Sequence, residues 1–505
     1  MTRSLKIILA ILFIIAVIGI ALFIYIKMHL PANEKRVSFN NATLINKIDK
    51  QLTDVDIKRV HSKEHYISQK SVAEIQHYLK TKMITHEDLV AYYLLRIKKV
   101  DQASNGNNAV SEVNDNAIKE AREYDKLSND NLALKGIPIL VKENINTDDM
   151  PTSAGTIALK DFIPDQNAPL IDKLKENGAI ILGKTNLSEL SFYMSTHNPL
   201  GYSAKKGQTH NPFNPLKISP SGSSSGSAVA AATDLATITI GTETSGSIVS
   251  PASVNSVVGF KPSHDKINGE GIIPISYHLD TPGPITRNVT DAALTYKLAS
   301  YDTMNLPVDK DYIKGKRIGL ITELTTNDDF WKDLKTSLEK MGAEIVDIDI
   351  KISSLSHLFI LQNDFEKNLN HYLKTYKAPV KSLKELVSFN KKDKKNRMRY
   401  GQGLLEDALK FEQHDKQKVE MNIQQAKDLL TKTISKNKLD ALVFKDNKGA
   451  VLPAIAGAPE ITVPFGIYKD SPAGATFFGL VNEDEKILNI AYSFEQNTLK
   501  RQIPN

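Results

Sequence analysis

Cysteine is absent from this chain of 505 residues. Its absence excludes disulfide bridges, thiolate zinc sites and a cysteine nucleophile, but it does not fix the compartment, because oxidising environments also hold cysteine-free proteins. A strong net charge is absent too, since 64 Lys and Arg stand against 58 Asp and Glu for a formal charge of +6. Because the lysines are dispersed and no stacking or groove-reading module is visible, we expect no nucleic-acid partner.

Histidine offers little that resembles a site, and none of the 12 histidines stands in a pattern that supports a serine base. The segment His61-Ser62-Lys63-Glu64-His65 matches the motif of an inverted zinc peptidase if it lies on one helix, where both histidines share a face. No third ligand is evident, and two histidines at this spacing arise easily by chance. We therefore interpret the segment as surface and expect no metal site.

Helical and strand-like segments alternate along the chain, which indicates an α/β sheet covered by helices on both faces. Ser71 and Thr85 each precede an acidic residue three positions later, as in the capping boxes that begin helices. With 41% hydrophobic residues the chain can bury a large core. We expect helices over Val72–Lys82, His86–Val100, Ala168–Asn177 and Ile487–Glu495, and strands over Ile139–Val141, Ala179–Leu182, Leu439–Phe444 and Glu460–Pro464.

The amino terminus carries an uninterrupted, uncharged apolar run from Ile7 to Ile26. At about 1.5 Å per residue this run spans roughly the 30 Å of a bilayer core, which predicts a membrane-spanning helix. A cleaved signal peptide is the alternative, but the run is longer than a usual apolar core of ~7–15 residues and no small-residue cleavage site follows. We expect an uncleaved anchor over residues 1–30 and a single pass through the cell membrane.

The positive charges on the two sides of the run nearly balance, so they do not decide its orientation. A short tail ahead of a large domain favours export of that domain to the extracytoplasmic side. Residues 31–69 are polar and weakly periodic, which predicts a stalk, and a folded domain follows over 70–505. Within it, about 329–437 reads as a lysine-rich helical insertion. Its basic run Lys391–Arg399 is interpreted as a solvated face rather than a docking patch for acidic lipid or polymer.

Two serine-and-glycine-rich segments, Ser221–Ala228 and Gly241–Ser247, carry most of the functional information. Such segments are usually flexible linkers. Here the residues between them, Val229–Ile240, predict a small-residue helix that runs into a buried strand. Linkers are not interleaved with buried elements in this way, so we interpret the two segments as an active site without histidine.

Amide hydrolysis needs a nucleophile, a group that takes its proton, and hydrogen-bond donors for the developing oxyanion. Ser247 lies at the end of Thr244-Ser245-Gly246, a turn whose backbone N–H groups could converge on an oxyanion. Ser223 carries a hydroxyl that can both donate and accept a proton. Lys142 closes an apolar strand, where burial would lower its pKa toward neutrality and make it a base.

These segments resemble the amidase signature family, and within it the peptide-amidase branch. The resemblance covers about residues 71–498 and includes several motifs in order. An amino-terminal membrane helix is also similar to that of fatty acid amide hydrolase. The motifs are Gly136-x-Pro138-x-x-Val141-Lys142, Ser221–Ala228, Gly241–Ile248 and Gly259-Phe260-Lys261-Pro262, supported by Gly183–Glu189, Gly222–Ala230, Gly271–Ser276, Asp280–Pro284 and Ala491–Gln496.

The resemblance implies a Ser-Ser-Lys triad in an amidase domain over residues 70–505, built on a central mixed sheet. The family's nucleophile falls on Ser247, its bridging serine on Ser223 after a cis bond from Gly222, and its lysine on Lys142. In the implied cycle the neutral amine draws a proton through the bridging serine, and the nucleophile forms an acyl-enzyme with a small-molecule or peptide amide. No cofactor or metal is implied.

Ser221, Ser225 and Ser245 stand where many members of the family have glycine, which affects the loop around the oxyanion donors Thr244, Ser245 and Gly246. Two other functions remain open. One is the glutamine-amidase subunit of an aminoacyl-tRNA amidotransferase, which the membrane helix disfavours. The other is a catalytically silent binding protein with the same fold, which the presence of all three triad residues disfavours. The sequence leaves the oligomeric state and the physiological amide undetermined.

Overall fold

The computed structural model describes residues 41–127 and 132–504. The predicted anchor over Ile7–Ile26 lies outside the described residues and stays a prediction. Among the residues that are described, no helix combines the length and apolar character that a membrane crossing requires.

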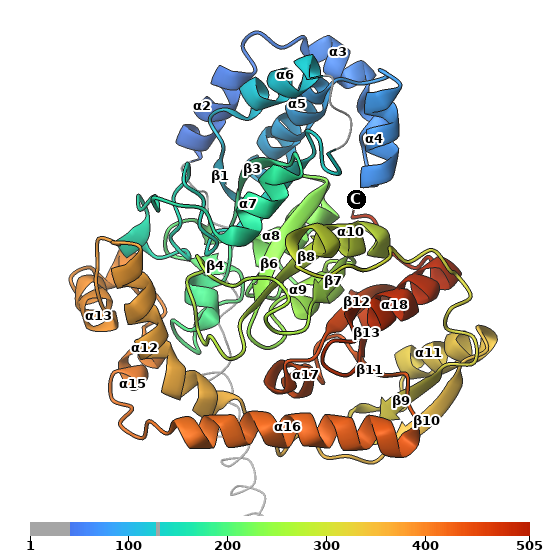
Figure 1. The fold of residues 1–505 in the computed structure, drawn as a ribbon. Helices are drawn as coiled ribbons and strands as arrows, with labels where there is room; N and C mark the ends of the chain where they lie inside the picture. The colour runs from blue at the N-terminus through green and yellow to red at the C-terminus, as the bar shows by residue number, and fades with distance from the viewer. Residues whose placement is uncertain (1–40, 128–131, 505) are drawn as a thin grey trace, which may run out of the picture.

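One large mixed sheet runs through the described chain, and its eleven strands lie in the order β1-β3-β2-β6-β8-β7-β12-β13-β11-β9-β10 (Figure 1). β2 pairs in parallel with β3 and β6, whereas β6 pairs antiparallel with β8. The predicted α/β fold with a mixed sheet is therefore confirmed. The strands are β1 (Val110–Val113), β2 (Pro138–Lys142), β3 (Ile180–Thr185), β6 (Ile238–Glu243), β7 (Val258–Lys261), β8 (Thr281–Thr286), β9 (Arg317–Ile321), β10 (Glu344–Ile348), β11 (Ala441–Lys445), β12 (Glu460–Tyr468) and β13 (Ser471–Phe478), and a separate small pair is β4 (Tyr202–Ser203) with β5 (Gly207–Gln208).

Helices surround this sheet, and two groups of them pack on its strands. α8 and α9 contact each other and the central strands, and α10 contacts both α7 and α18. The helices are α2 (Ala42–Gln51), α3 (Ile57–Ser62), α4 (Val72–Lys80), α5 (His86–Arg96), α6 (Ala117–Lys126), α7 (Pro169–Glu176), α8 (Ser225–Ala232), α9 (Val249–Val254), α10 (Val289–Ala299), α11 (Asp329–Lys340), α12 (Leu358–Thr375), α13 (Leu383–Lys391), α14 (Lys394–Arg397), α15 (Gly403–Ala408), α16 (Lys416–Asn437), α17 (Val451–Ala456) and α18 (Asp484–Thr498).

The capping boxes predicted at Ser71 and Thr85 are present. The Ser71 hydroxyl accepts from the N–H of Glu74, and the Thr85 hydroxyl accepts from the N–H of Asp88, with the acid side chain reaching back in each case. Each cap supplies two of the bonds that a helix start otherwise lacks, so α4 and α5 begin where the sequence predicts.

The segment 31–69 differs from the predicted stalk wherever the structure describes it. α2 buries Leu44 and Ile48, and α3 buries Val60, all in the same apolar cluster as the sheet. Arg59 of α3 also pairs with Glu87 and Asp88 of α5. The folded body therefore includes residues 41–69, because a few apolar residues at helical spacing are enough to dock a segment that is polar overall.

The region 329–437 is also only partly the helical insertion that was predicted. Its first part, α11 followed by β10, belongs to the sheet, since β10 pairs in parallel with β9. The helical part begins with α12 at Leu358 and ends with α16 at Asn437. β10 was missed because it is an edge strand with mostly exposed or half-buried side chains, so it lacks a continuous apolar run.

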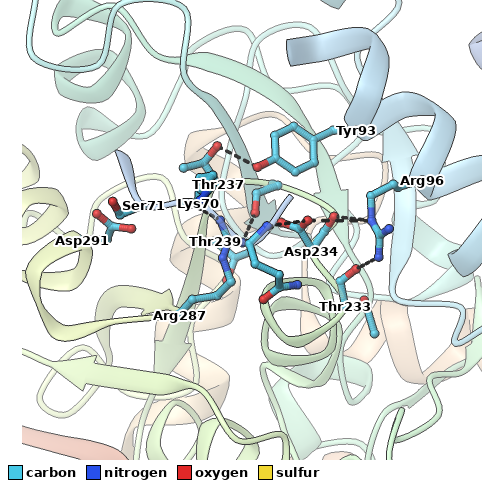
Figure 2. Close-up of polar contacts among 12 residues, drawn as sticks. Lys70, Ser71, Tyr93, Arg96, Thr233, Asp234, Thr237, Thr239, Arg287 and Asp291 are labelled. Atoms are coloured by element: carbon cyan, nitrogen blue, oxygen red, sulfur yellow. Dashed lines mark hydrogen bonds and ion pairs between the residues drawn. The ribbon is translucent and has the colours of Figure 1, made fainter. Parts of the chain in front are cut away.

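A buried polar network holds the connection between α8 and β6 (Figure 2). Arg96 donates to the carbonyl oxygens of Thr233 and Asp234 at 2.7 and 2.9 Å. The buried guanidinium of Arg287 lies 3.1 Å from the Asp234 carboxylate and donates to the Lys70 carbonyl at 2.8 Å. This connection joins the two serine-and-glycine-rich segments, so the network stabilises the elements that carry both of them.

Candidate active site

Lys142 is the last residue of β2, and its side chain is fully buried. Its Nζ lies 2.7 Å from Ser223 Oγ, 2.8 Å from Thr242 Oγ1 and 3.1 Å from the Thr242 carbonyl oxygen. Burial lowers the pKa of Lys142 to about 7, against the opposing effect of Asp280 and Glu243. Near neutral pH this amine is therefore uncharged in a large fraction of molecules, as a proton acceptor must be.

Strand register explains why Lys142 meets Thr242. β2 and β6 run side by side in parallel, with Val141 opposite Ile240. The ends of the two strands therefore lie at the same edge of the sheet, and the residues that follow this pair come together there. This long-range pairing brings Lys142 to the second serine-and-glycine-rich segment.

Ser223 is buried and is joined to Gly222 by a cis peptide bond, as the family resemblance implied. The next residue, Ser224, ties the two segments to each other. Its N–H donates to the Ser247 carbonyl at 3.2 Å, and its Oγ accepts from the Thr242 N–H at 3.1 Å. The structure therefore brings together Lys142, Ser223 and the backbone of Ser247.

The Ser247 side chain is half-exposed and follows Gly246, whose φ of 83° lies in the left-handed region that favours glycine. Within the described chain, the Ser247 hydroxyl makes no hydrogen bond, to Ser223 or to any other group. The contact between Lys142 and Ser223 that the implied proton path requires is therefore present, whereas the described residues show no hydrogen bond between the Ser223 and Ser247 hydroxyls.

Glu243, which the sequence analysis did not single out as a site residue, shapes the turn before Ser247. Its buried carboxylate accepts from the N–H groups of Gly246 and Ile248, each at 2.6 Å, and of Val249 at 3.0 Å. The N–H of Gly246 is therefore directed at Glu243 and is not free for an oxyanion in this arrangement. Among the residues described, the N–H groups of Thr244, Ser245 and Ser247 remain without a hydrogen bond and are the available donors.

Asp280 is a second residue that the sequence reasoning placed in a motif without a role. Its Oδ1 accepts from the Thr244 hydroxyl at 2.5 Å, and its Oδ2 accepts from the N–H groups of Ile275 and Ser276 at 2.7 and 3.0 Å. Burial raises the pKa of Asp280 to about 6. This carboxyl therefore joins the Thr244 turn to the loop ahead of β8.

Glu460 of β12 lies behind this turn with both carboxyl oxygens buried. Burial, and then the proximity of Glu243, raise its pKa well above the ordinary value. A second buried lysine, Lys184 of β3, donates to the Ile145 carbonyl and to Thr152 Oγ1, and burial lowers its pKa to about 7. Lys184 supports the chain that follows Lys142 rather than the serines.

A cavity of about 660 Å³ opens beside these residues. Asn144, Thr242, Thr244 and Asp280 are among its described lining residues, and α12 contributes His371 and Thr375. The helical part of the predicted insertion therefore lines a cavity that reaches Thr242 and Thr244, the neighbours of Lys142 and of the turn before Ser247.

The zinc alternative at His61 and His65 is not favoured by the geometry. α3 ends at Ser62, between the two histidines, so they do not share one continuous helix. His61 Nε2 lies 3.1 Å from Lys99 Nζ. In the described part of the chain, no group of three or more His, Asp or Glu side chains is arranged to hold a metal ion.

Comparison with known proteins identifies the family. The chain matches the Amidase family over residues 88–445. A probable amidase of Arabidopsis thaliana is 33% identical over 87% of this chain and 92% of its own length. A glutamyl-tRNA(Gln) amidotransferase subunit of Thermoanaerobacter pseudethanolicus is 31% identical over 84% of this chain and 96% of its own length.

Solved structures agree with this assignment. An amidase family protein from Bacillus anthracis str. Ames is 38% identical, with a TM-score of 0.90, over 94% of this chain and all of that one. The native peptide amidase from Stenotrophomonas maltophilia is 34% identical, with a TM-score of 0.80, over 87% of this chain and 99% of that one. The chain, whose motifs and site geometry pointed in the same direction, belongs to the amidase signature family.

Proposed function

We propose that this protein hydrolyses linear carboxylic acid amides, including the C-terminal amides of peptides, through a Ser-Ser-Lys triad and a seryl acyl-enzyme. The observation that carries the proposal is the buried Lys142 amine, 2.7 Å from Ser223 Oγ. A buried lysine without a carboxylate partner is costly to keep, and perturbed amines of this kind concentrate at functional sites.

In the proposed cycle Lys142 accepts the proton of Ser223, and Ser223 accepts the proton of Ser247 as its oxygen attacks the carbonyl carbon. The available N–H groups of Ser245 and Ser247 stabilise the oxyanion, each such donor being worth about a hundredfold to a thousandfold in rate. The same path then returns the proton to the leaving ammonia or amine. Water enters, loses a proton to the relay and releases the acid, and no cofactor or metal takes part.

A screen of primary amides for ammonia release by the full-length protein tests this proposal. We expect Ser247→Ala to abolish turnover, because it removes the attacking oxygen, while the protein stays folded by circular dichroism. Ser388→Ala is the matched control, since Ser388 bonds only within α13, through its hydroxyl to the Lys384 carbonyl. Undiminished ammonia release by Ser247→Ala would contradict the proposed nucleophile.

The peptide-amidase branch and the cellular location belong to the same proposal. The peptide amidase of Stenotrophomonas maltophilia resembles the chain over nearly its whole length, which supports peptide-like amides as substrates. The apolar run Ile7–Ile26 supports a single-pass anchor with the catalytic domain on the extracytoplasmic side. Membrane fractionation with protease protection tests both the anchor and its orientation. If the catalytic domain were protected from protease in sealed cells, the proposed extracytoplasmic orientation would be wrong.

An amidotransferase subunit is the second candidate, and the glutamyl-tRNA(Gln) amidotransferase relative supports it. Stoichiometric co-purification with a tRNA-binding subunit, together with glutamine-dependent ammonia release, would favour this candidate over a free-standing amidase. A folded protein that binds amides without any turnover, with or without a partner, would favour the silent binding protein.

A further inference from the structure

The cavity that reaches Thr242 and Thr244 has an acidic lining. Four carboxyl groups line it, those of Asp172, Asp265, Glu270 and Asp280, and no Lys or Arg is among its described lining residues. Asp280 is half-buried, and the other three residues are exposed. Because walls of low dielectric concentrate the field of such groups, the cavity attracts positive charge.

Glu270 is the least satisfied of these carboxylates. Asp172 accepts from Asn167 Nδ2 at 2.9 Å, and Asp265 lies 3.1 Å from the imidazole of His264. Within the described chain, the Glu270 carboxylate makes no hydrogen bond or ion pair. Its charge is therefore available to a group that enters the cavity.

Two tyrosines line the cavity beside Glu270. The pKa values of Tyr277 and Tyr376 are raised, first by burial, and Glu270 adds to the rise in both. The field of this carboxylate thus reaches both rings. Aromatic faces beside a carboxylate form a favourable environment for an ammonium or a guanidinium group.

One of the residues that line the cavity, Asn144, carries an unpaired buried acceptor. Asn144 is only 1% exposed, and its Nδ2 donates to Thr242 Oγ1 at 3.0 Å. Its Oδ1 has no hydrogen-bond partner in the described chain. A buried carbonyl without a partner is costly, so a ligand that donates an N–H here would satisfy it.

The substrate part that enters the cavity follows from the proposed reaction. When a primary amide is cleaved, the leaving group is ammonia, which needs no pocket of its own. A cavity of about 660 Å³ must therefore receive the acyl part. We propose, on the basis of the proposed amidase function, that this protein prefers amides whose acyl part carries an ammonium or guanidinium group, held by Glu270 and the neighbouring carboxylates, with Asn144 accepting an N–H.

Three primary amides of similar length test the preference: the α-amides of Nα-acetyl-lysine, Nα-acetyl-norleucine and Nα-acetyl-glutamate. The full-length protein in neutral detergent is assayed for ammonia release at pH 8. We expect kcat/KM to be highest for the lysine amide and lowest for the glutamate amide. Exposed charges contribute modestly, so the lysine amide should exceed the norleucine amide by about five- to tenfold at low salt, and less at 0.5 M salt.

Glu270→Gln should reduce the ratio of kcat/KM for the lysine amide to kcat/KM for the norleucine amide about two- to fivefold. Glu339→Gln is the matched control, because Glu339 is an exposed carboxylate on α11 and does not line the cavity. The ratio of kcat/KM for the lysine and norleucine amides in Glu339→Gln should equal the ratio in the unmodified protein. An unchanged ratio in Glu270→Gln, or equal rates for the three amides, would overturn the preference while leaving the amidase function standing.

Binding separates failure of the inference from failure of the proposed function. The full-length Ser247→Ala protein is titrated calorimetrically with the same three amides, so that affinity is measured without turnover. Selective binding of the lysine amide with no hydrolysis by the unmodified protein would support the acidic cavity and overturn the amidase proposal. Absence of selective binding and of hydrolysis would overturn both.

Discussion

At the scale of single residues, the proposed mechanism depends on keeping one amine uncharged inside the protein. Lys142 has carbonyl and hydroxyl oxygens around its Nζ and, among the described residues, no carboxylate in hydrogen-bond contact. Its environment can therefore accept either the ammonium or the amine. Burial decides between them, and it brings the pKa of Lys142 to about 7, where a general base is most effective.

The first prediction concerns the pH dependence of activity. Because the deprotonated amine is the base, kcat/KM should rise with pH and level off above about pH 7, the pKa of Lys142. Lys142→Arg keeps the positive charge but cannot lose its proton, so it should lower kcat by about a hundredfold to ten-thousandfold across this range. End-point ammonia assays from pH 5 to 9 measure both effects. A kcat/KM that falls as the pH rises from 6 to 8 would contradict the assignment of Lys142 as the base.

A second prediction concerns Glu460. Its folded-state pKa is raised, so between the unfolded value near 4.5 and the folded value the folded protein holds a proton that the unfolded chain releases. The stability that this group contributes is full below about pH 4.5 and declines as pH rises. Glu460→Gln should therefore raise Tm at pH 8 more than at pH 5. Thermal unfolding at both pH values measures the difference, with the exposed Glu339→Gln as a control that should show none.

At the scale of elements, local signals predicted more than long-range ones. The capping boxes predicted where α4 and α5 begin, and the apolar run before Lys142 predicted β2. The role of Glu243 was not predictable in the same way. Its carboxylate matters because the chain folds back on it over the next six residues, and periodicity carries no information about such a turn.

The meeting of the two serine-and-glycine-rich segments illustrates the same limit. Lys142 and Thr242 are 100 positions apart, and they meet because β2 and β6 are neighbours in the sheet. The order of the strands in a sheet cannot be predicted from the amino-acid composition of either strand. Residue chemistry indicated Lys142 as a base and Ser223 as a proton-relaying hydroxyl, and the family resemblance placed them in one triad. Neither could show that the Gly246 N–H is engaged by Glu243.

The third prediction concerns the network at the end of α8 shown in Figure 2. Arg287→Ala would remove the shorter of the two ion pairs of the buried Asp234 carboxylate and leave only Arg96 at 4.0 Å among the described residues. Removing one partner of a buried pair costs about 3–5 kcal/mol. We expect a large fall in the free energy of unfolding, measured by urea denaturation at pH 7. Arg317→Ala is the control, because Arg317 pairs with Glu344 at a largely exposed position and should cost under about 1 kcal/mol. An equal loss of unfolding free energy in the two variants would show that burial does not determine how much the Arg287 ion pair stabilises the protein.

At the scale of the whole molecule, the boundary between body and amino-terminal extension lies earlier than the composition indicated. Six apolar side chains between residues 41 and 69 are buried in the main cluster, namely those of Leu44, Ile48, Leu52, Val55, Val60 and Ile67. A segment with this many buried contacts is part of the folded domain rather than a tether. The polar residues around them face solvent, which is why the segment as a whole resembles a stalk.

The fourth prediction follows from this boundary and compares two truncations. Burying a large aliphatic side chain contributes about 1.5–3 kcal/mol, so loss of the six with residues 1–69 should cost about 9–18 kcal/mol. That cost is comparable to the whole stability of most domains, about 5–15 kcal/mol. Removing residues 1–40 leaves in place the buried contacts that α2 and α3 make within the described part of the chain. We expect the shorter truncation to unfold cooperatively and to keep the amide hydrolysis of the full chain, and the longer one to aggregate or to lose its thermal transition. An unchanged Tm after the longer truncation would show that α2 and α3 contribute little to the stability of the domain. It would support the interpretation of residues 31–69 as a stalk.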